Sequence, residues 1–147
     1  TNIICHNIRI SKNNLTKIIK KYDYVVDGSD NFETKFLIND FSKKFQKYLV
    51  TGAISKFDGH IFTFDFKNKN TPCIRSFFQE NKISDDMLNC EYEGILGTVA
   101  GIIGTIQANE VLKKILGIGK DLNGYILVID LLNLNFRKVK LNKLKNV

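Results

Sequence analysis

The sequence predicts an α/β fold with a mostly parallel sheet and an antiparallel extension. Three observations support this prediction. Short apolar segments alternate with helical patterns over residues 1–53, a long apolar helix pattern begins near residue 95, and two strand patterns follow it. Short apolar strands between helices are typical of a parallel sheet that is buried on both faces. The chain has 147 residues, which is enough for one domain with a substantial core.

The first part of the chain predicts the order strand, helix, strand, helix, strand. Apolar residues at the appropriate spacing predict strands at 3–10, 24–26 and 48–51 and helices at 15–20 and 32–45. The connections between these elements have the usual length of crossovers between parallel strands.

Beyond residue 53 the pattern changes. The pair Asp58-Gly59 indicates a tight turn, and the alternation over 61–66 predicts a strand with phenylalanines on one face. Residues 68–92 show no clear period, and a loop of this length is usually functional or mobile. The closing pattern predicts strands at 124–132 and 134–141.

Residues 95–116 predict a buried helix. Its small residues recur at steps of three and four, which lets another backbone approach closely. The apolar run at 94–106 is shorter than the roughly 20 residues that a membrane span needs. We therefore expect no membrane association.

The composition indicates the cellular compartment and limits the kinds of partner that we expect. The three cysteines, Cys5, Cys73 and Cys90, are widely spaced, which favours a reducing, cytoplasmic environment. The net charge of +7 comes almost entirely from lysine. Because the chain is also rich in asparagine and isoleucine, as products of AT-rich genomes are, we do not expect a nucleic-acid partner.

The strongest local signal for chemistry is the segment Asp27-Gly28-Ser29-Asp30-Asn31. It follows a predicted parallel strand and begins a helix, and open α/β sheets bind ligands at that edge. Two carboxylates three positions apart suit Mg²⁺ with substrate phosphates. The alternative is that Asp30 or Asn31 only caps the helix. No glycine-rich phosphate loop of either common pattern is present.

The cysteines and histidines give weaker signals. Cys90 precedes the long helix, where a thiol can become nucleophilic, although neighbouring glutamates oppose thiolate formation. Cys73 has Ser76 where a zinc site usually has its second cysteine. His6 and His60 are isolated and are expected to be surface or strand histidines and not bases or metal ligands.

Several short segments, taken together and in order, resemble the MoeB/ThiF/HesA family of ubiquitin-activating-enzyme-like adenylyltransferases. The segments are 24–31, 49–53, 57–60, 72–75, 89–97 and 101–113. The resemblance implies a Rossmann-like fold and an enzyme that uses Mg-ATP to adenylate the C-terminal glycine of a ubiquitin-like sulfur-carrier protein. Sulfur then replaces AMP, and the thiocarboxylate serves thiamine or molybdopterin synthesis. The resemblance also favours a homodimer.

The resemblance assigns roles to individual residues. Asp30 matches the catalytic aspartate that works with Mg²⁺ and the ATP phosphates, with Asp27 and Asn31 as cofactor-binding neighbours. Cys90 matches a cysteine that forms a covalent link to the carrier in some members and is dispensable in others. Cys73 matches the first of four zinc cysteines, but Ser76 replaces the second, so the zinc is expected to be missing.

The resemblance also implies that the chain is the later part of a single activating domain. Residues 1–53 correspond to the end of the Rossmann-like sheet, 54–93 to antiparallel strands and a mobile crossover loop, and 94–147 to a long helix and closing strands. The N-terminal nucleotide-binding half is expected to be absent, so this piece alone is expected to be inactive. The alternatives are a non-catalytic partner subunit of a ubiquitin-like activating heterodimer, and a basic binding module for nucleic acid or membrane.

Overall fold

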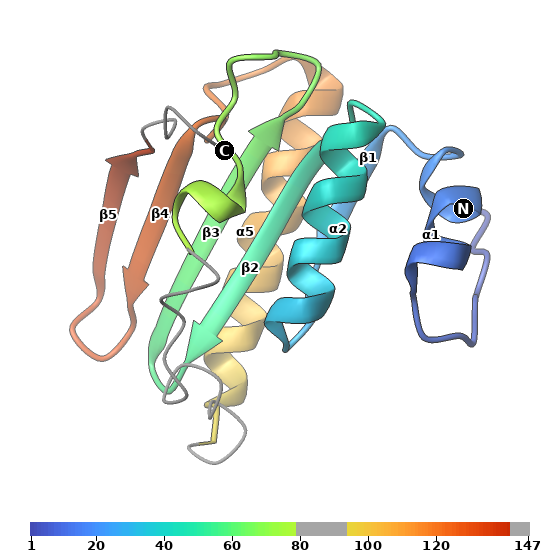
Figure 1. Ribbon diagram of the computed structural model, residues 1–147. Coiled ribbons are helices and arrows are strands. Elements are labelled where there is room, and N and C mark those ends of the chain that lie inside the picture. Colours follow the sequence, from blue (N-terminus) through green and yellow to red (C-terminus); the bar gives the residue numbers. More distant parts are fainter. Residues whose placement is uncertain (79–93, 142–147) are drawn as a thin grey trace.

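The computed structural model describes residues 1–78 and 94–141, which contain one five-stranded sheet with helices on both faces (Figure 1). In sheet order, the strands are β1 (Tyr24–Asp27), β2 (Tyr48–Ser55), β3 (Asp58–Asp65), β4 (Tyr125–Asp130) and β5 (Asn135–Lys140). The helices are α1 (Lys12–Ile19), α2 (Phe32–Lys44) and α5 (Gly97–Leu116), with a 3₁₀ turn η1 (Ile74–Ser76). The predicted α/β class and antiparallel extension are confirmed.

Parallel pairing is less extensive than the sequence predicts. Strands β1 and β2 pair in parallel, whereas β2–β3, β3–β4 and β4–β5 are antiparallel. The sheet described here is therefore mixed. A hairpin loop of two residues joins β2 to β3 and reverses the direction of the chain. Another parallel strand would need a longer crossover connection, usually a helix.

The predicted strand at residues 3–10 does not form in the structure. This segment has no regular structure, and the side chains of Ile3, Ile4 and Ile8 are exposed. A strand requires a neighbour to satisfy its backbone N–H and C=O groups. Within residues 1–78 and 94–141, no strand lies beside this segment, so the apolar pattern alone does not suffice.

The sheet separates two hydrophobic cores. On the face covered by α2 and η1, aromatic side chains dominate, with Phe62, Phe64 and Phe66 projecting from β3 and the strand's end. On the face covered by α5, Val50 and Ile61 pack against the helix. The predicted division of 61–66 into two faces is confirmed.

Gly59 is a packing residue and not a turn residue, contrary to the sequence prediction. The chain turns at Lys56 and Phe57, and Asp58-Gly59 already belongs to β3. A Cβ atom at position 59 would lie 2.2 Å from Cδ1 of Ile103, and one at Gly52 would lie 3.0 Å from Gln107 and Ile103. The two glycines therefore form the hollow in which α5 approaches the sheet.

The sequence predicts a buried helix, and in the structure helix α5 is buried along one face. Val99, Ile103, Gln107 and Glu110 face the sheet. The small residues of α5 lie on its exposed side, where its glycines have open space around them. Among the described residues, no helix is both long and apolar enough to cross a bilayer.

Candidate functional site

The segment from Asp27 to Asn31 lies at the carboxyl ends of the two parallel strands. Asp27 is the last residue of β1 and is in register with Thr51 on β2. The next residues turn directly into α2, which begins at Phe32. The sequence prediction of a polar turn at this edge is confirmed, and it is the edge at which open α/β sheets bind ligands.

The carboxylate of Asp27 is buried, with only 1% of the residue exposed. Its Oδ1 accepts hydrogen bonds from the backbone N–H and the hydroxyl of Ser29, at 2.9 and 2.6 Å. Its Oδ2 accepts from Nζ of Lys35, at 3.2 Å, and from the hydroxyl of Thr51. Four donors occupy the roughly four acceptor positions of a carboxylate. Asp27 therefore holds the turn together and has no oxygen left for a cofactor.

Asp30 has the opposite environment. Its side chain is exposed, and Oδ1 accepts one hydrogen bond from Nδ2 of Asn31, at 3.1 Å. That hydrogen bond is the largest cause that lowers the pKa of Asp30, and the positive charges of Lys35 and Arg9 act in the same direction. Asp30 is therefore a carboxylate that remains ionised and faces solvent.

Asn31 caps helix α2. Its Oδ1 accepts a hydrogen bond from the backbone N–H of Thr34, at 2.8 Å. A helix-capping hydrogen bond of this kind stabilises a protein by about 1 kcal/mol. The alternative that Asp30 or Asn31 caps the helix therefore holds for Asn31 and does not apply to Asp30.

Two residues of the site were missed at the sequence level. Lys35 of α2 is 5% exposed, and its Nζ donates to Asp27 and to the carbonyl oxygen of Gly52. Gln107 of α5 donates from Nε2 to the backbone carbonyl of Asp27, at 2.8 Å. Lys35 belongs to a buried polar line with Asn39 and Ser42 on α2. In a sequence, polar residues spaced four and three positions apart on the inner face of a helix indicate a buried polar row of this kind.

A magnesium ion fits Asp30 but not Asp27. Mg²⁺ in nucleotide sites is usually held by one or two carboxylates together with water and substrate phosphates. Asp30 is exposed and offers one such ligand, whereas Asp27 is already neutralised by Lys35. Within residues 1–78 and 94–141, no three acidic, histidine or cysteine side chains gather into a metal cluster.

A zinc ion does not fit the residues around Cys73. The thiol is 3% exposed and belongs to the aromatic core on the α2 side of the sheet. Its neighbour at the expected ligand position is the hydroxyl of Ser76, 4.0 Å from Sγ. No second thiol of the described residues lies beside it, since Cys5 is exposed and separate. Cys90 lies outside the described residues.

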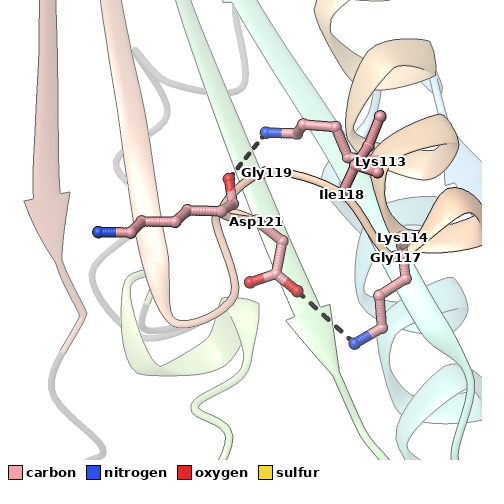
Figure 2. A pocket seen from close by; sticks show the side chains of 7 residues that line it. Lys113, Lys114, Gly117, Ile118, Gly119 and Asp121 are labelled. Carbon is pink, nitrogen blue, oxygen red and sulfur yellow. Dashed lines mark hydrogen bonds and ion pairs between the residues drawn. The ribbon is translucent and has the colours of Figure 1, made fainter.

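A shallow pocket lies at the opposite end of α5 (Figure 2). The helix begins beside Lys56 at the carboxyl end of β2, and Lys114 near its other end lies over the ring of Tyr48. In the pocket Lys113 donates to the carbonyl oxygen of Lys120, at 3.0 Å, while Lys114 pairs with Asp121, at 3.6 Å (Figure 2). These lysines stabilise the loop after α5 and are remote from Asp30.

Two relatives that are similar in sequence are named as adenylyltransferases. A sulfur carrier protein adenylyltransferase from Thermus thermophilus is 37% identical over 139 residues, covering 92% of this chain and 51% of the relative. A probable molybdopterin-synthase adenylyltransferase from Pyropia yezoensis is 37% identical over 140 residues, covering 95% of this chain and 36% of the relative. The chain thus spans about half, or less, of the length of these curated relatives.

The fold itself recurs in solved structures. The crystal structure of E. coli MccB with ATP matches with a TM-score of 0.70 at 15% identity, covering 95% of this chain and 43% of that one. At this identity the match concerns the fold alone. The model of the ThiF family matches residues 1–147. With the parallel edge, the acidic turn and these matches in agreement, the chain belongs to the ThiF family.

Proposed function

We propose that this chain is part of an ATP-dependent adenylyltransferase that activates the C-terminal glycine of a ubiquitin-like sulfur-carrier protein. The observation that carries the proposal is Asp30, an exposed, ionised carboxylate at the carboxyl end of a parallel strand. Family membership and the names of the relatives support the reaction class.

Asp30 is the residue that would hold the metal of Mg-ATP. Asn31 donates one hydrogen bond to this carboxylate, and the Asp27 turn holds the backbone that precedes it. When bound, magnesium offsets the charge of the phosphates during attack by the carrier's carboxylate. The match to MccB, whose structure was solved with ATP, supports nucleotide use on this fold.

The chain is proposed to be the later part of one activating domain. Its boundaries are those of the sequence analysis: 1–53 for the end of the sheet, 54–93 for the hairpin and crossover segment, and 94–147 for the long helix and closing strands. The chain covers 51% and 36% of the length of two relatives, which supports a part of a larger protein, whereas the internal boundaries rest on the resemblance. Cys90 is proposed as a nucleophile toward the carrier, and zinc is not proposed because Cys73 and Ser76 do not fit it.

The partner is proposed to be the carrier protein together with a second copy of this subunit, in the cytoplasm. The exposed apolar side of α5 supports self-association, because large exposed apolar patches mark interaction sites. The thiocarboxylate product is proposed to serve molybdopterin or thiamine synthesis. The names of the relatives favour the molybdopterin route.

ATP–pyrophosphate exchange tests the proposed function. We expect the protein at its full natural length to catalyse exchange only with a carrier that ends in glycine, and we expect the 147-residue chain alone to be inactive. A carrier that lacks its last glycine is the matched control. Robust exchange without any carrier, or by the 147-residue chain alone, would contradict the proposal.

A further inference from the structure

A buried ion pair between Lys35 and Asp27 lies at the start of the turn that carries Asp30. Lys35 and Asp27 are 5% and 1% exposed, and Nζ of Lys35 lies 3.2 Å from Oδ2 of Asp27. Neither side chain faces solvent, and both are hydrogen-bonded within the protein. Removing one partner of a buried pair leaves an uncompensated charge and is strongly destabilising.

We propose that Lys35 is a positioning residue for Asp30, which its side chain fixes through the Asp27 turn. The inference rests on the proposed function in so far as Asp30 acts on Mg-ATP. Lys35 itself is expected to touch neither nucleotide nor carrier.

The first route from Lys35 to Asp30 runs through Asp27. The ammonium group bridges the carboxylate of Asp27 on β1 and the carbonyl oxygen of Gly52 on β2. The same carboxylate holds both the backbone N–H and the hydroxyl of Ser29. Because Ser29 directly precedes Asp30, fixing Asp27 fixes the backbone on one side of Asp30.

A second connection runs through the backbone of the helix and does not use the lysine side chain. Lys35 lies one helical turn after the capping residue, and its backbone N–H donates to the carbonyl oxygen of Asn31, at 3.1 Å. Asn31 in turn donates from Nδ2 to Oδ1 of Asp30. This connection holds Asn31 beside Asp30, but any residue at position 35 would supply the same backbone bond, so the lysine side chain acts through Asp27.

The ion pair connects three elements at one point. Lys35 comes from α2, Asp27 from β1, and Thr51, which shares Oδ2 of Asp27, from β2. Gln107 of α5 adds a fourth element through the carbonyl oxygen of Asp27. A catalytic carboxylate must be held within a fraction of an ångström, and positioning groups of this kind provide that precision.

Hydrogen–deuterium exchange on the full-length protein tests positioning without any activity. We expect Lys35→Met to accelerate exchange about tenfold in the peptide that contains residues 27–34, because local opening of the turn becomes easier. The peptide that contains β4 should stay unchanged. Lys35→Arg, which keeps the charge and the donors, should stay within about threefold of wild type.

Asn39→Leu is the matched control. Asn39 is fully buried one turn later on α2, and its Oδ1 accepts from the backbone N–H of Ile74, so the variant destabilises the same helix without touching the turn. If Asn39→Leu accelerates exchange at 27–34 as much as Lys35→Met does, Lys35 is merely structural and the proposal fails. If Lys35→Met does not fold, the experiment uses the double variant Asp27→Asn/Lys35→Met, which removes both charges of the pair. The double variant should retain fast exchange at 27–34, and full protection there would contradict the proposal.

Enzyme kinetics provide a second test of the positioning role. In ATP–pyrophosphate exchange we expect Lys35→Met to lower kcat about 10²-fold, with KM for the carrier unchanged, and Lys35→Arg to restore kcat. Wild-type kcat in Lys35→Met would overturn the positioning role. Absence of exchange in the wild-type protein would refute the proposed function instead, and the deuterium result would still decide the role of Lys35.

Discussion

At the residue scale, Asp27 and Asp30 are three positions apart and have opposite surroundings. Asp27 is buried and neutralised by Lys35, whereas Asp30 faces solvent with a lowered pKa. Two carboxylates with different environments commonly serve two different roles. Here one carboxylate holds the turn and the other is available to a ligand.

The sequence could predict that both aspartates follow a strand, but not which one is buried. That distinction depends on Lys35 and Thr51, which lie 8 and 24 positions beyond Asp27. Such partners become adjacent only when α2 packs on the sheet and β2 aligns with β1. Local spacing carries no information about either event.

His60 supplies a pH prediction at the same scale. Burial in β3 lowers the pKa of His60, while the nearby Asp58 acts weakly in the opposite direction. The unfolded chain therefore binds a proton before the folded protein does, so the free energy of unfolding falls as the pH drops below about 6.5. We expect urea midpoints at pH 7.5 and 5.5 to differ less in His60→Gln than in wild type.

His6 provides the control for that measurement, because it is exposed in the N-terminal segment. His6→Gln should keep the pH dependence of the wild-type protein. Equal pH dependence in wild type and His60→Gln would show that His60 is not the group responsible.

At the element scale, the glycines of β2 and β3 set the distance between α5 and the sheet. The sequence predicts that the small residues of α5 let another backbone approach closely, but these residues lie on the exposed side of the helix. Periodicity shows that small residues share one face of a helix, but it does not show which face meets the sheet. The glycines that accommodate the helix, Gly52 and Gly59, lie in strands where no helical period exists.

The close approach at Gly59 gives a stability prediction. In Gly59→Ala the new methyl group would collide with Cδ1 and Cγ1 of Ile103, which is buried, so we expect a loss of about 1–3 kcal/mol. Ile103→Val removes the Cδ1 methyl group. The double variant should therefore be more stable than the sum of the single effects in urea unfolding.

Gly101→Ala is the matched control on the exposed side of α5, where a Cβ atom meets nothing within 4 Å. It should be neutral or stabilise the protein by up to about 1 kcal/mol, because alanine is the better helix former. Additive effects of Gly59→Ala and Ile103→Val would contradict the collision with Ile103.

At the scale of the whole molecule, the outer side of α5 remains uncovered in the described structure. Leu112, Ile115 and Leu116 are more than half exposed on this helix. The sequence could predict an apolar helix, but whether its second side is covered depends on contacts outside this chain. The same reason explains residues 3–10, whose apolar pattern finds no neighbouring strand among the described residues.

Self-association through α5 is open to a direct test. We expect the full-length protein to sediment as a dimer and Leu112→Glu to sediment as a monomer, because a charge on this side opposes burial. Lys120→Glu changes the loop after α5 and should leave the dimer intact. A wild-type monomer at micromolar concentration would contradict the proposed homodimer.

The most direct test of the central claim is the rate of ATP–pyrophosphate exchange in Asp30→Ala, measured in the full-length protein with its carrier. Asp40→Ala is the control, because Asp40 is an exposed carboxylate on α2 that pairs with Arg75. We predict that Asp30→Ala lowers the rate about 10²- to 10³-fold, while Asp40→Ala stays within about threefold of wild type. Exchange at the wild-type rate in Asp30→Ala would contradict the claim that this carboxylate acts on Mg-ATP.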